Sequence, residues 1–243
     1  MIDLHCHILP GIDDGSKNLA ESLKILRHAA EAGVTTAILT PHYVRDSKYN
    51  CNNARKNQLL EILKIAVQDA EIPIDLHLGN EVYLDQNLLD LLSSGEIATL
   101  ANSRYLLIEL PVLTEDQTAR DTLFKLITSG FTPIIAHPER YAYVQKDPHY
   151  LDAFIELGCL FQGDYQSLLG KYGRAAKKSL AQLIKAGTIT FLASDTHHSS
   201  DDYNLRKAIR RTCGLVKTAR EAEALFETNP RKVLENATIS PKA

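Results

Sequence analysis

The sequence has few cysteines, and they occur in none of the spacings that would make them structural. The four thiols, at Cys6, Cys51, Cys159 and Cys213, form no C-x-x-C pair and no zinc-ribbon spacing. A small disulfide-stapled fold and a cysteine-ligated structural zinc site are therefore excluded. No targeting segment precedes Met1, so we expect a cytoplasmic protein with reduced thiols.

Long hydrophobic runs and a strongly basic balance are also missing. No apolar stretch approaches the roughly 20 residues that cross a bilayer, so membrane insertion is not expected. The chain has 27 Lys and Arg against 30 Asp and Glu, a net charge of −3. Nucleic acid is therefore not expected as a partner, because its phosphates need a strongly basic face. From residue 204 onward the balance is +5, which suits either solvated helices or attraction of an acidic phosphopeptide.

The sequence does contain a repeated alternation of short strands and longer amphipathic helices. With 243 residues, 44 % of them hydrophobic, one large domain can bury a substantial core. Seven strand–helix units fit a closed barrel better than an open doubly wound sheet, and the Gly-rich dinucleotide fingerprint is absent. We therefore expect a single-domain α/β fold over 1–243, a TIM-like (β/α)7 barrel with a helical C-terminal region from about residue 204. The expected strands cover 2–4, 35–40, 74–78, 105–110, 132–136, 160–163 and 188–193, and the expected earlier helices 19–32, 54–70, 84–92, 118–128, 150–157 and 175–186.

Histidine or carboxylate residues follow six of these seven strands. In a β/α barrel the carboxyl ends of the strands converge on one face, and that face carries the active site. Helix caps use Ser, Thr, Asp or Asn rather than His, so capping does not account for the set. Its members are His5, His7, His42, Glu81, Glu109, His137, Asp195 and His197.

The spacing and number of these residues predict a metal centre with more than one ion. His5 and His7, two positions apart at the end of a strand, point to the same face. With Asp13 or Asp14 from the loop between Gly11 and Gly15, the set exceeds the about four to six ligands that one ion takes. We expect two or three ions that share bridging carboxylates. Mixed imidazole and carboxylate ligands suit manganese, iron or zinc.

The stretches that contain these residues resemble the PHP (polymerase and histidinol phosphatase) superfamily. Within it, the chain is similar to the bacterial tyrosine-protein phosphatases of capsule and exopolysaccharide operons. The opening stretch with its Asp-Asp-Gly turn and the His-Pro-Glu-Arg stretch are the most specific to this branch. The matches run in order across nearly the whole chain: MIDLHCH (1–7), GIDDG (11–15), TPH (40–42), GNEVY (79–83), LIE (107–109), IAHPER (135–140), ASDTH (193–197) and TNPR (228–231).

The resemblance implies a distorted seven-stranded barrel with three divalent metal ions, manganese before iron or zinc. The implied ligands are His5, His7, Glu81 and Asp195 for the first ion, Glu81, Glu109 and His137 for the second, and Asp14, His42 and His197 for the third. Asp14 is chosen over Asp13, although spacing alone does not separate the two. The implied activity is a metal-dependent protein-tyrosine phosphatase. Its substrate would be the phosphotyrosine-bearing tail of a bacterial tyrosine autokinase that controls capsular or exopolysaccharide synthesis.

The resemblance also assigns catalytic roles. Arg140, His42 and His197 are the candidate catalytic residues, and Arg140 would also hold phosphate oxygens bidentately. The Arg-Pro-Pro stretch usual in this family after the Asp-x-His motif is replaced by residues 198–204, so a second phosphate-binding arginine is not placed. Arg206 is a weak candidate for that role. His198 is expected to be solvated or supporting rather than a general acid.

Other functions fit parts of the pattern. A PHP-type histidinol-phosphate phosphatase, or another phosphoesterase, would keep the barrel and its metals. A metal-stabilised domain that only binds the kinase tail would keep the ligands without turnover. A cysteine-dependent phosphatase is excluded, because its Cys-x5-Arg loop is absent: the residues six after each cysteine are Ile12, Asn57, Tyr165 and Ala219.

Overall fold

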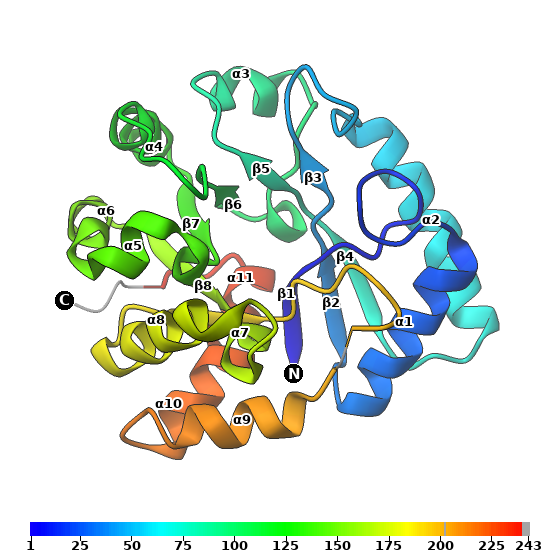
Figure 1. Ribbon diagram of the computed structural model, residues 1–243. Coiled ribbons are helices and arrows are strands. Elements are labelled where there is room, and N and C mark those ends of the chain that lie inside the picture. Colours follow the sequence, from blue (N-terminus) through cyan, green and yellow to red (C-terminus); the bar gives the residue numbers. More distant parts are fainter. Residues whose placement is uncertain (202, 240–243) are drawn as a thin grey trace.

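The computed structural model describes residues 1–201 and 203–239, which alternate between strands and helices (Figure 1). Two of the seven expected strands, over 35–40 and 74–78, each continue after a break into a further short strand that the sequence did not indicate. The strands are β1 (Ile2–Cys6), β2 (Thr36–Leu39), β3 (His42–Tyr43), β4 (Asp75–Leu78), β5 (Glu81–Tyr83), β6 (Tyr105–Glu109), β7 (Thr132–Ala136), β8 (Leu160–Asp164) and β9 (Phe191–Ala193).

The two splits occur side by side. β2 leads through Pro41 into β3, and β4 leads through Gly79 into β5. Proline has no N–H to donate to the hydrogen-bond ladder, so Pro41 suits an interruption of the strand. Gly79 marks a close approach, since a Cβ there would lie 2.6 Å from the Leu100 side chain, and it suits an interruption as well. The hydrogen-bonded orders are therefore β1-β2-β4 and β3-β5-β6-β7-β8-β9, with every pairing parallel.

The barrel closes where the end of β9 returns to β1. The Asp195 N–H donates to the His5 carbonyl at 2.9 Å, and the His7 N–H donates to the Thr196 carbonyl at 2.8 Å. Cys6 and Thr196 form an isolated parallel bridge. Among the described residues, the backbone hydrogen bonds that close the barrel lie only where the chain leaves β1 and β9. This arrangement confirms the expected distorted β/α barrel with seven strand positions.

Helices surround the barrel (Figure 1). Their bounds are α1 (Leu19–Ala32), α2 (Asn53–Asp69), α3 (Leu88–Ser93), α4 (Ala119–Thr128), α5 (Ala142–Lys146), α6 (Asp152–Leu157), α7 (Tyr165–Leu169), α8 (Gly173–Ala186), α9 (Leu205–Cys213), α10 (Ala219–Glu223) and α11 (Asn229–Leu234). Short turns η1 (Leu100–Asn102), η2 (Pro138–Arg140) and η3 (Pro148–Leu151) and a π-helical turn η4 (Ala224–Thr228) complete the set. The expected helix over 84–92 is wrong at its start, because β5 extends to Tyr83 and α3 begins only at Leu88.

The interior of the barrel is apolar at one end of the strands and polar at the other. Alternate residues of β6 and β9 face inward, because successive side chains of a strand point to opposite faces. Tyr105 and Leu107 on β6, and Phe191 and Ala193 on β9, join one buried apolar cluster. Two residues further on, the same faces carry Glu109 and Asp195. This buried apolar cluster therefore packs against the polar end of the barrel and supports it. Among the described helices, none is long and apolar enough to span a bilayer.

Candidate metal centre

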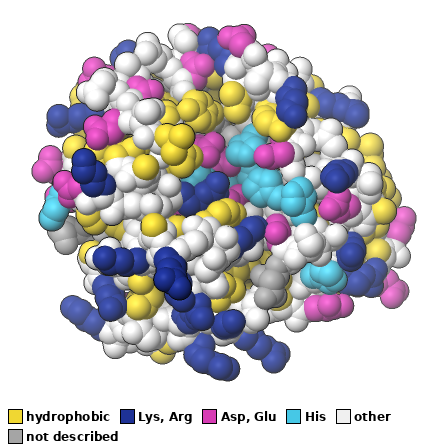
Figure 2. Space-filling model, viewed as in Figure 1, with side chains coloured by type: hydrophobic (Ala, Val, Ile, Leu, Met, Phe, Trp, Pro, Cys, Tyr) yellow, Lys and Arg dark blue, Asp and Glu magenta, His cyan; other side chains and the backbone are white. Residues whose placement is uncertain are grey.

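The residues expected at the site lie together at the carboxyl ends of the strands. Figure 2 shows histidine side chains gathered in a hollow of the molecule, with acidic and basic side chains beside them. His137 and Asp195 follow β7 and β9 with φ of +30° and +49°. This left-handed backbone is uncommon without glycine and turns the chain sharply where each strand ends.

Four ligand atoms from three parts of the chain lie at the corners of a tetrahedron whose edges are all within 4.8 Å. Nε2 of His5 and Nε2 of His7 lie 3.1 Å apart. Oε2 of Glu81 is 3.3 Å and 3.2 Å from these two nitrogens. Oδ1 of Asp195 is 3.3 Å from each of them. Five of the six edges are therefore between 3.1 and 3.3 Å.

The tetrahedron has the size that a divalent metal ion requires. The centre of a regular tetrahedron with such edges lies about 2.0 Å from each corner, which is a normal Zn–N or Zn–O distance. Oε2 of Glu81 and Oδ1 of Asp195 are buried and have no hydrogen-bond partner among the described residues. Two orphaned acceptors that share one centre with two imidazole nitrogens fit a cation better than any hydrogen-bond network.

Both imidazoles are fixed by a hydrogen bond at the opposite nitrogen. Nδ1 of His5 lies 2.7 Å from Oε1 of Gln162, and Nδ1 of His7 lies 2.8 Å from Oδ2 of Asp13. Because amide and carboxylate oxygens only accept, the Nδ1 atoms carry the protons. The Nε2 atoms are therefore free to offer a lone pair.

The structure separates Asp13 from Asp14. Asp13 is buried, and its oxygens already accept from Nδ1 of His7 and the backbone N–H groups of Gly15 and His42. The partnership with His7 outweighs burial and lowers the pKa of Asp13 to about 2. Asp14 is 49 % exposed, with Oδ1 3.5 Å from Nε2 of His42 and 3.6 Å from Nε2 of His197. Asp14, and not Asp13, therefore lies in the group with His42 and His197, whereas Asp13 supports His7.

Asp14, His42 and His197 form a second group with His7, in which the ligand atoms lie within 4.8 Å of one another. Nδ1 of His197 donates to the backbone carbonyl of Asp195 at 3.0 Å, which leaves Nε2 toward Asp14. Burial and the positive charge of His7 lower the pKa of His197 to about 4. A neutral imidazole is the form that binds metal.

Glu81 and Glu109 form the third group, together with His42. His137 contacts the same two carboxylates, with Nε2 2.7 Å from Oε1 of Glu81 and 3.7 Å from Oε1 of Glu109. Burial and the negative charge of Glu81 raise the pKa of Glu109 to about 7. A second cation between these carboxylates would remove that repulsion.

Glu81 connects the groups. Its Oε1 contacts His137, while its Oε2 contacts His5, His7 and, at 3.0 Å, Nδ1 of His42. Burial opposes ionisation of Glu81, but the charges of His5 and His42 outweigh it and hold its pKa well below the usual range. An ionised carboxylate in this position can bridge two metal ions.

Comparisons with known proteins identify the family to which the chain belongs. The sequence profile of the family described as capsular polysaccharide synthesis, CpsB/CapC, matches residues 1–235. The chain belongs to the CpsB/CapC family. Within it, the chain is 32 % identical over 198 residues to the tyrosine-protein phosphatase YwqE of Bacillus subtilis (strain 168), covering 82 % of this chain and 78 % of YwqE. It is 28 % identical over 244 residues to the tyrosine-protein phosphatase CpsB of Streptococcus pneumoniae, covering 98 % and 100 %.

The solved structures agree with this membership of the CpsB/CapC family. A chain from the crystal structures of YwqE from Bacillus subtilis and CpsB from Streptococcus pneumoniae, described as unique metal-dependent tyrosine phosphatases, superposes with a TM-score of 0.93. The identity is 29 %, and the match covers 100 % of this chain and 97 % of that one. The histidinol phosphate phosphatase of Lactococcus lactis superposes with a TM-score of 0.59 at 12 % identity over 93 % and 94 % of the two chains, and shares the fold.

Arg140 of this CpsB/CapC chain lies beside the tetrahedron. Its Nη1 donates to Oδ2 of Asp195 at 2.7 Å, and its guanidinium carbon is 4.4 Å from the ring centre of Tyr172. The Tyr172 hydroxyl donates to the same Oδ2 at 3.4 Å. Arg140 therefore orients Asp195, and its side chain is still 25 % exposed. Arg206 and His198 are exposed and belong to none of the three ligand groups among the described residues, although the His198 ring centre lies 6.1 Å from that of His197.

The sequence analysis missed Gln162 and Tyr172. β8 is the one expected strand without a His, Asp or Glu assigned at its end, yet its Gln162 holds His5. The available signal was an amide inside a buried strand, two positions before Asp164 on the same face. Tyr172 lies in the loop between α7 and α8, where no sequence pattern indicated a role.

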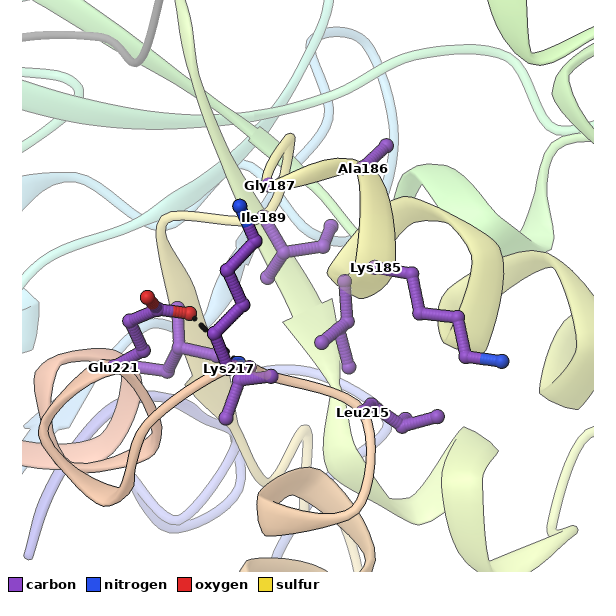
Figure 3. Close-up of a pocket in the computed structure, with 10 residues that line it drawn as sticks. Lys185, Ala186, Gly187, Ile189, Leu215, Lys217 and Glu221 are labelled. Carbon is purple, nitrogen blue, oxygen red and sulfur yellow. Dashed lines mark hydrogen bonds between the residues drawn. The ribbon is translucent and has the colours of Figure 1, made fainter.

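The molecule also has a pocket away from this centre. Figure 3 shows it between the end of α8 and the segment before α10, with Ile189, Leu215 and Lys217 among its lining residues. Its volume is 170 Å³. Because Ile189 precedes β9 whereas Asp195 follows it, this pocket lies toward the amino end of that strand. It is separate from the histidine and carboxylate groups.

Proposed function

We propose that this CpsB/CapC chain is a metal-dependent protein-tyrosine phosphatase. The observation that carries the proposal is the tetrahedron of His5, His7, Glu81 and Asp195, whose edges match a divalent metal ion. The relatives described as tyrosine-protein phosphatases, with which the chain aligns over most of its length, supply the substrate class.

The ligand sets suggest three divalent ions, with manganese preferred over iron or zinc. His5, His7, Glu81 and Asp195 would hold the first, Glu81, Glu109 and His137 the second, and Asp14, His42 and His197 the third. When bound, such ions supply Lewis acidity toward phosphate oxygens and a nucleophile at neutral pH. The nitrogen and oxygen ligands, without thiolates, support this choice of metals.

The chain's own residues position the reaction. Arg140 has one N–H group on Asp195, and its remaining N–H groups are available to clamp phosphate oxygens. Asp13 and Gln162 hold His7 and His5 in the tautomer that ligates. His42 and His197, which are 15 % and 18 % exposed, line the open side of the site. Together with Arg140 they are the residues to which we assign a catalytic role.

The substrate we propose is the phosphotyrosine-bearing tail of a bacterial tyrosine kinase that controls capsular or exopolysaccharide synthesis. The family described as capsular polysaccharide synthesis supports the pathway. Four free cysteines, at Cys6, Cys51, Cys159 and Cys213, support a cytoplasmic location. A buried cluster that includes residues from Cys6 to Phe226 supports a single domain over 1–243.

The test is hydrolysis of a phosphotyrosine peptide by metal-stripped protein, with and without added Mn²⁺, beside histidinol phosphate. We expect peptide turnover that returns with the metal and exceeds turnover of histidinol phosphate. Histidinol phosphate turnover alone would replace the proposal by the alternative phosphatase. Metal binding without turnover of either substrate would favour the interaction domain.

Two ligand variants and one matched control assign the activity to the site. His5→Ala and Asp195→Ala each remove a corner of the tetrahedron, so activity and bound metal should both be lost. His77→Ala is the control, because His77 contacts Asp75 on β4 and belongs to none of the three groups. Wild-type turnover by a folded His5→Ala or Asp195→Ala protein would refute the site.

A further inference from the structure

The positive charge of the chain is concentrated on two helices. α8 and α9 together carry eight basic residues and no acidic one: Arg174, Lys177, Lys178, Lys185, Arg206, Lys207, Arg210 and Arg211. The rest of the chain keeps 19 of the 27 basic residues against all 30 acidic ones, a net charge of −11. An even distribution of charged residues would not produce this contrast. The two helices therefore differ in charge from the remaining surface.

These helices border the hollow that contains the metal-ligand groups. The loop before α8 is anchored at the site, since Tyr172 stacks under Arg140 and Lys171 pairs with Asp201 at 2.9 Å. Asp201 in turn accepts from the backbone N–H of His197 at 2.9 Å. Figure 2 shows dark blue side chains gathered below the histidines, where Figure 1 places α8 and α9.

The charges point to solvent because the other sides of both helices are packed. On α8, Ala176, Leu180 and Leu183 are buried. On α9, Leu205 and Ala208 are buried, and Arg211 binds the Leu168 carbonyl at the end of α7. The exposed residues that remain define the basic surface: Arg174, Lys177, Lys178, Lys185, Arg206, Lys207 and Arg210.

We propose that the basic surface binds acidic residues that flank the phosphotyrosine of the substrate. The inference rests on the proposed function, because a phosphate seated in the hollow leads the adjoining polypeptide across the neighbouring helices. Seven exposed cations exceed what one phosphate can use, and they lie outside the ligand groups. Charge complementarity over such a surface raises association rates and selects partners.

A polypeptide fits this surface better than a lipid bilayer. A membrane-binding helix presents aromatic or aliphatic side chains beside its basic residues. On α8 and α9, Ile209 at 36 % is the single large apolar residue among those exposed. Arg206, which the sequence offered as a weak phosphate ligand, belongs here to the surface that contacts the peptide.

The test compares peptides that share a central phosphotyrosine and differ only in acidic, neutral or basic flanks. We expect kcat/KM at about 50 mM salt to be on the order of tenfold higher for acidic than for basic flanks, through KM. The preference should shrink at about 300 mM salt, where exposed charges are screened. Binding of difluoromethylphosphonate versions, which are not hydrolysed, gives the same comparison without turnover.

The variant Lys177→Glu/Arg210→Glu reverses one charge on each helix. We expect it to abolish the preference for acidic flanks while p-nitrophenyl phosphate turnover stays unchanged. Lys24→Glu/Arg27→Glu, on the exposed face of α1, is the matched control and should retain the preference. Equal binding of acidic and basic non-hydrolysable peptides by wild type would overturn the inference, whatever the substrate of the enzyme.

A lipid assay tests whether an anionic membrane, rather than an acidic peptide, binds the basic surface. Wild type is sedimented with phosphatidylglycerol vesicles, beside neutral phosphatidylcholine vesicles and the Lys177→Glu/Arg210→Glu variant. We expect no binding that depends on the basic surface. Vesicle binding lost in this variant, without a charge preference among peptides, would assign the surface to the membrane instead. Failure of the proposed function is a separate result, seen as absence of phosphotyrosine turnover in every peptide.

Discussion

Oδ2 of Asp13 accepts a hydrogen bond from Nδ1 of His7 at 2.8 Å, and the same oxygen accepts from the backbone N–H of His42 at 3.0 Å. One buried carboxylate therefore orients the His7 ring, just after β1, and the start of β3. Its neighbour Asp14 points to His42 and His197 instead. Adjacent residues of one loop thus have different tasks.

This division predicts different results for the two aspartates. Asp13→Ala frees the His7 ring, so affinity for the metal of the tetrahedron should fall about 10- to 100-fold. Asp14→Ala removes a ligand of another group and should lower the number of tightly bound ions by one. Metal content after dialysis and metal titrations measure both. Full retention of metal by Asp13→Ala would show that His7 is oriented without it.

The role of the loop also predicts the effect of a small substitution at Gly15. A Cβ there would lie 2.0 Å from the His7 carbonyl oxygen and 2.6 Å from its Cβ, so the backbone must move. Gly15→Ala should cost about 1–3 kcal/mol of the free energy of unfolding and weaken metal binding. Gly33→Ala is the control: its φ of +102° also strains an alanine, but nothing lies within 4 Å. Metal loss should be specific to Gly15→Ala, measured with thermal melts and metal analysis.

The sequence predicted the barrel and the polar residues gathered at one end of it, because each of these residues follows a hydrophobic run. His5, His42 and Asp195 were visible as polar residues where strands end, and the structure brings them together. The separation of Asp13 from Asp14 was not visible, because it depends on the path of one loop. Gln162 was missed because an amide in a strand gives no chemical signal until its partner His5 is placed beside it. The splits at Pro41 and Gly79 also needed the packed structure.

A buried lysine predicts a pH dependence of stability. Nζ of Lys56 donates to Oδ1 of Asn80 and, at 3.0 Å, to the Glu96 carbonyl. Asn80 lies in the break between β4 and β5, directly before Glu81. Its amide also donates to the Pro41 carbonyl at 2.8 Å, and so connects this break to the one between β2 and β3. Burial lowers the pKa of Lys56 to about 7. Between that value and about 10.4 the unfolded chain binds more protons, so the free energy of unfolding should rise with pH.

The measurement is denaturation of the metal-loaded protein between pH 7 and 9. Relative to Lys56→Met, wild type should gain up to about 1.4 kcal/mol per pH unit. Lys64→Met on the same helix, where the side chain is 42 % exposed, is the matched control and should run parallel to wild type. Parallel curves for Lys56→Met and wild type would mean that Lys56 stays charged in the fold.

The tetrahedron predicts that metal binding displaces protons. Burial lowers the pKa of His5, but the negative charges of Glu81 and Asp195 outweigh it and raise the pKa to about 9. In the metal-free protein near pH 7.5 His5 therefore carries a proton, which takes the place of the cation between the two carboxylates. A metal ion must displace this proton to reach Nε2. Because contacts with Asp13, Asp195 and Glu81 raise the pKa of His7 as well, apparent metal affinity should rise about tenfold per pH unit for each proton displaced, up to about pH 9.

The same exchange separates the stabilities of the two forms. The raised pKa of His5 stabilises the metal-free fold fully below its unfolded value of 6.5, and this contribution is lost as pH rises through about 9. The metal-loaded form has no such proton to lose, so the stability difference between the forms should widen over that range. The contribution of Lys56 is common to both and cancels. Calorimetric titrations of Mn²⁺ in buffers of different ionisation enthalpy count the protons released. A metal affinity that stays constant between pH 7 and 9 would show that His5 is already neutral before the metal arrives.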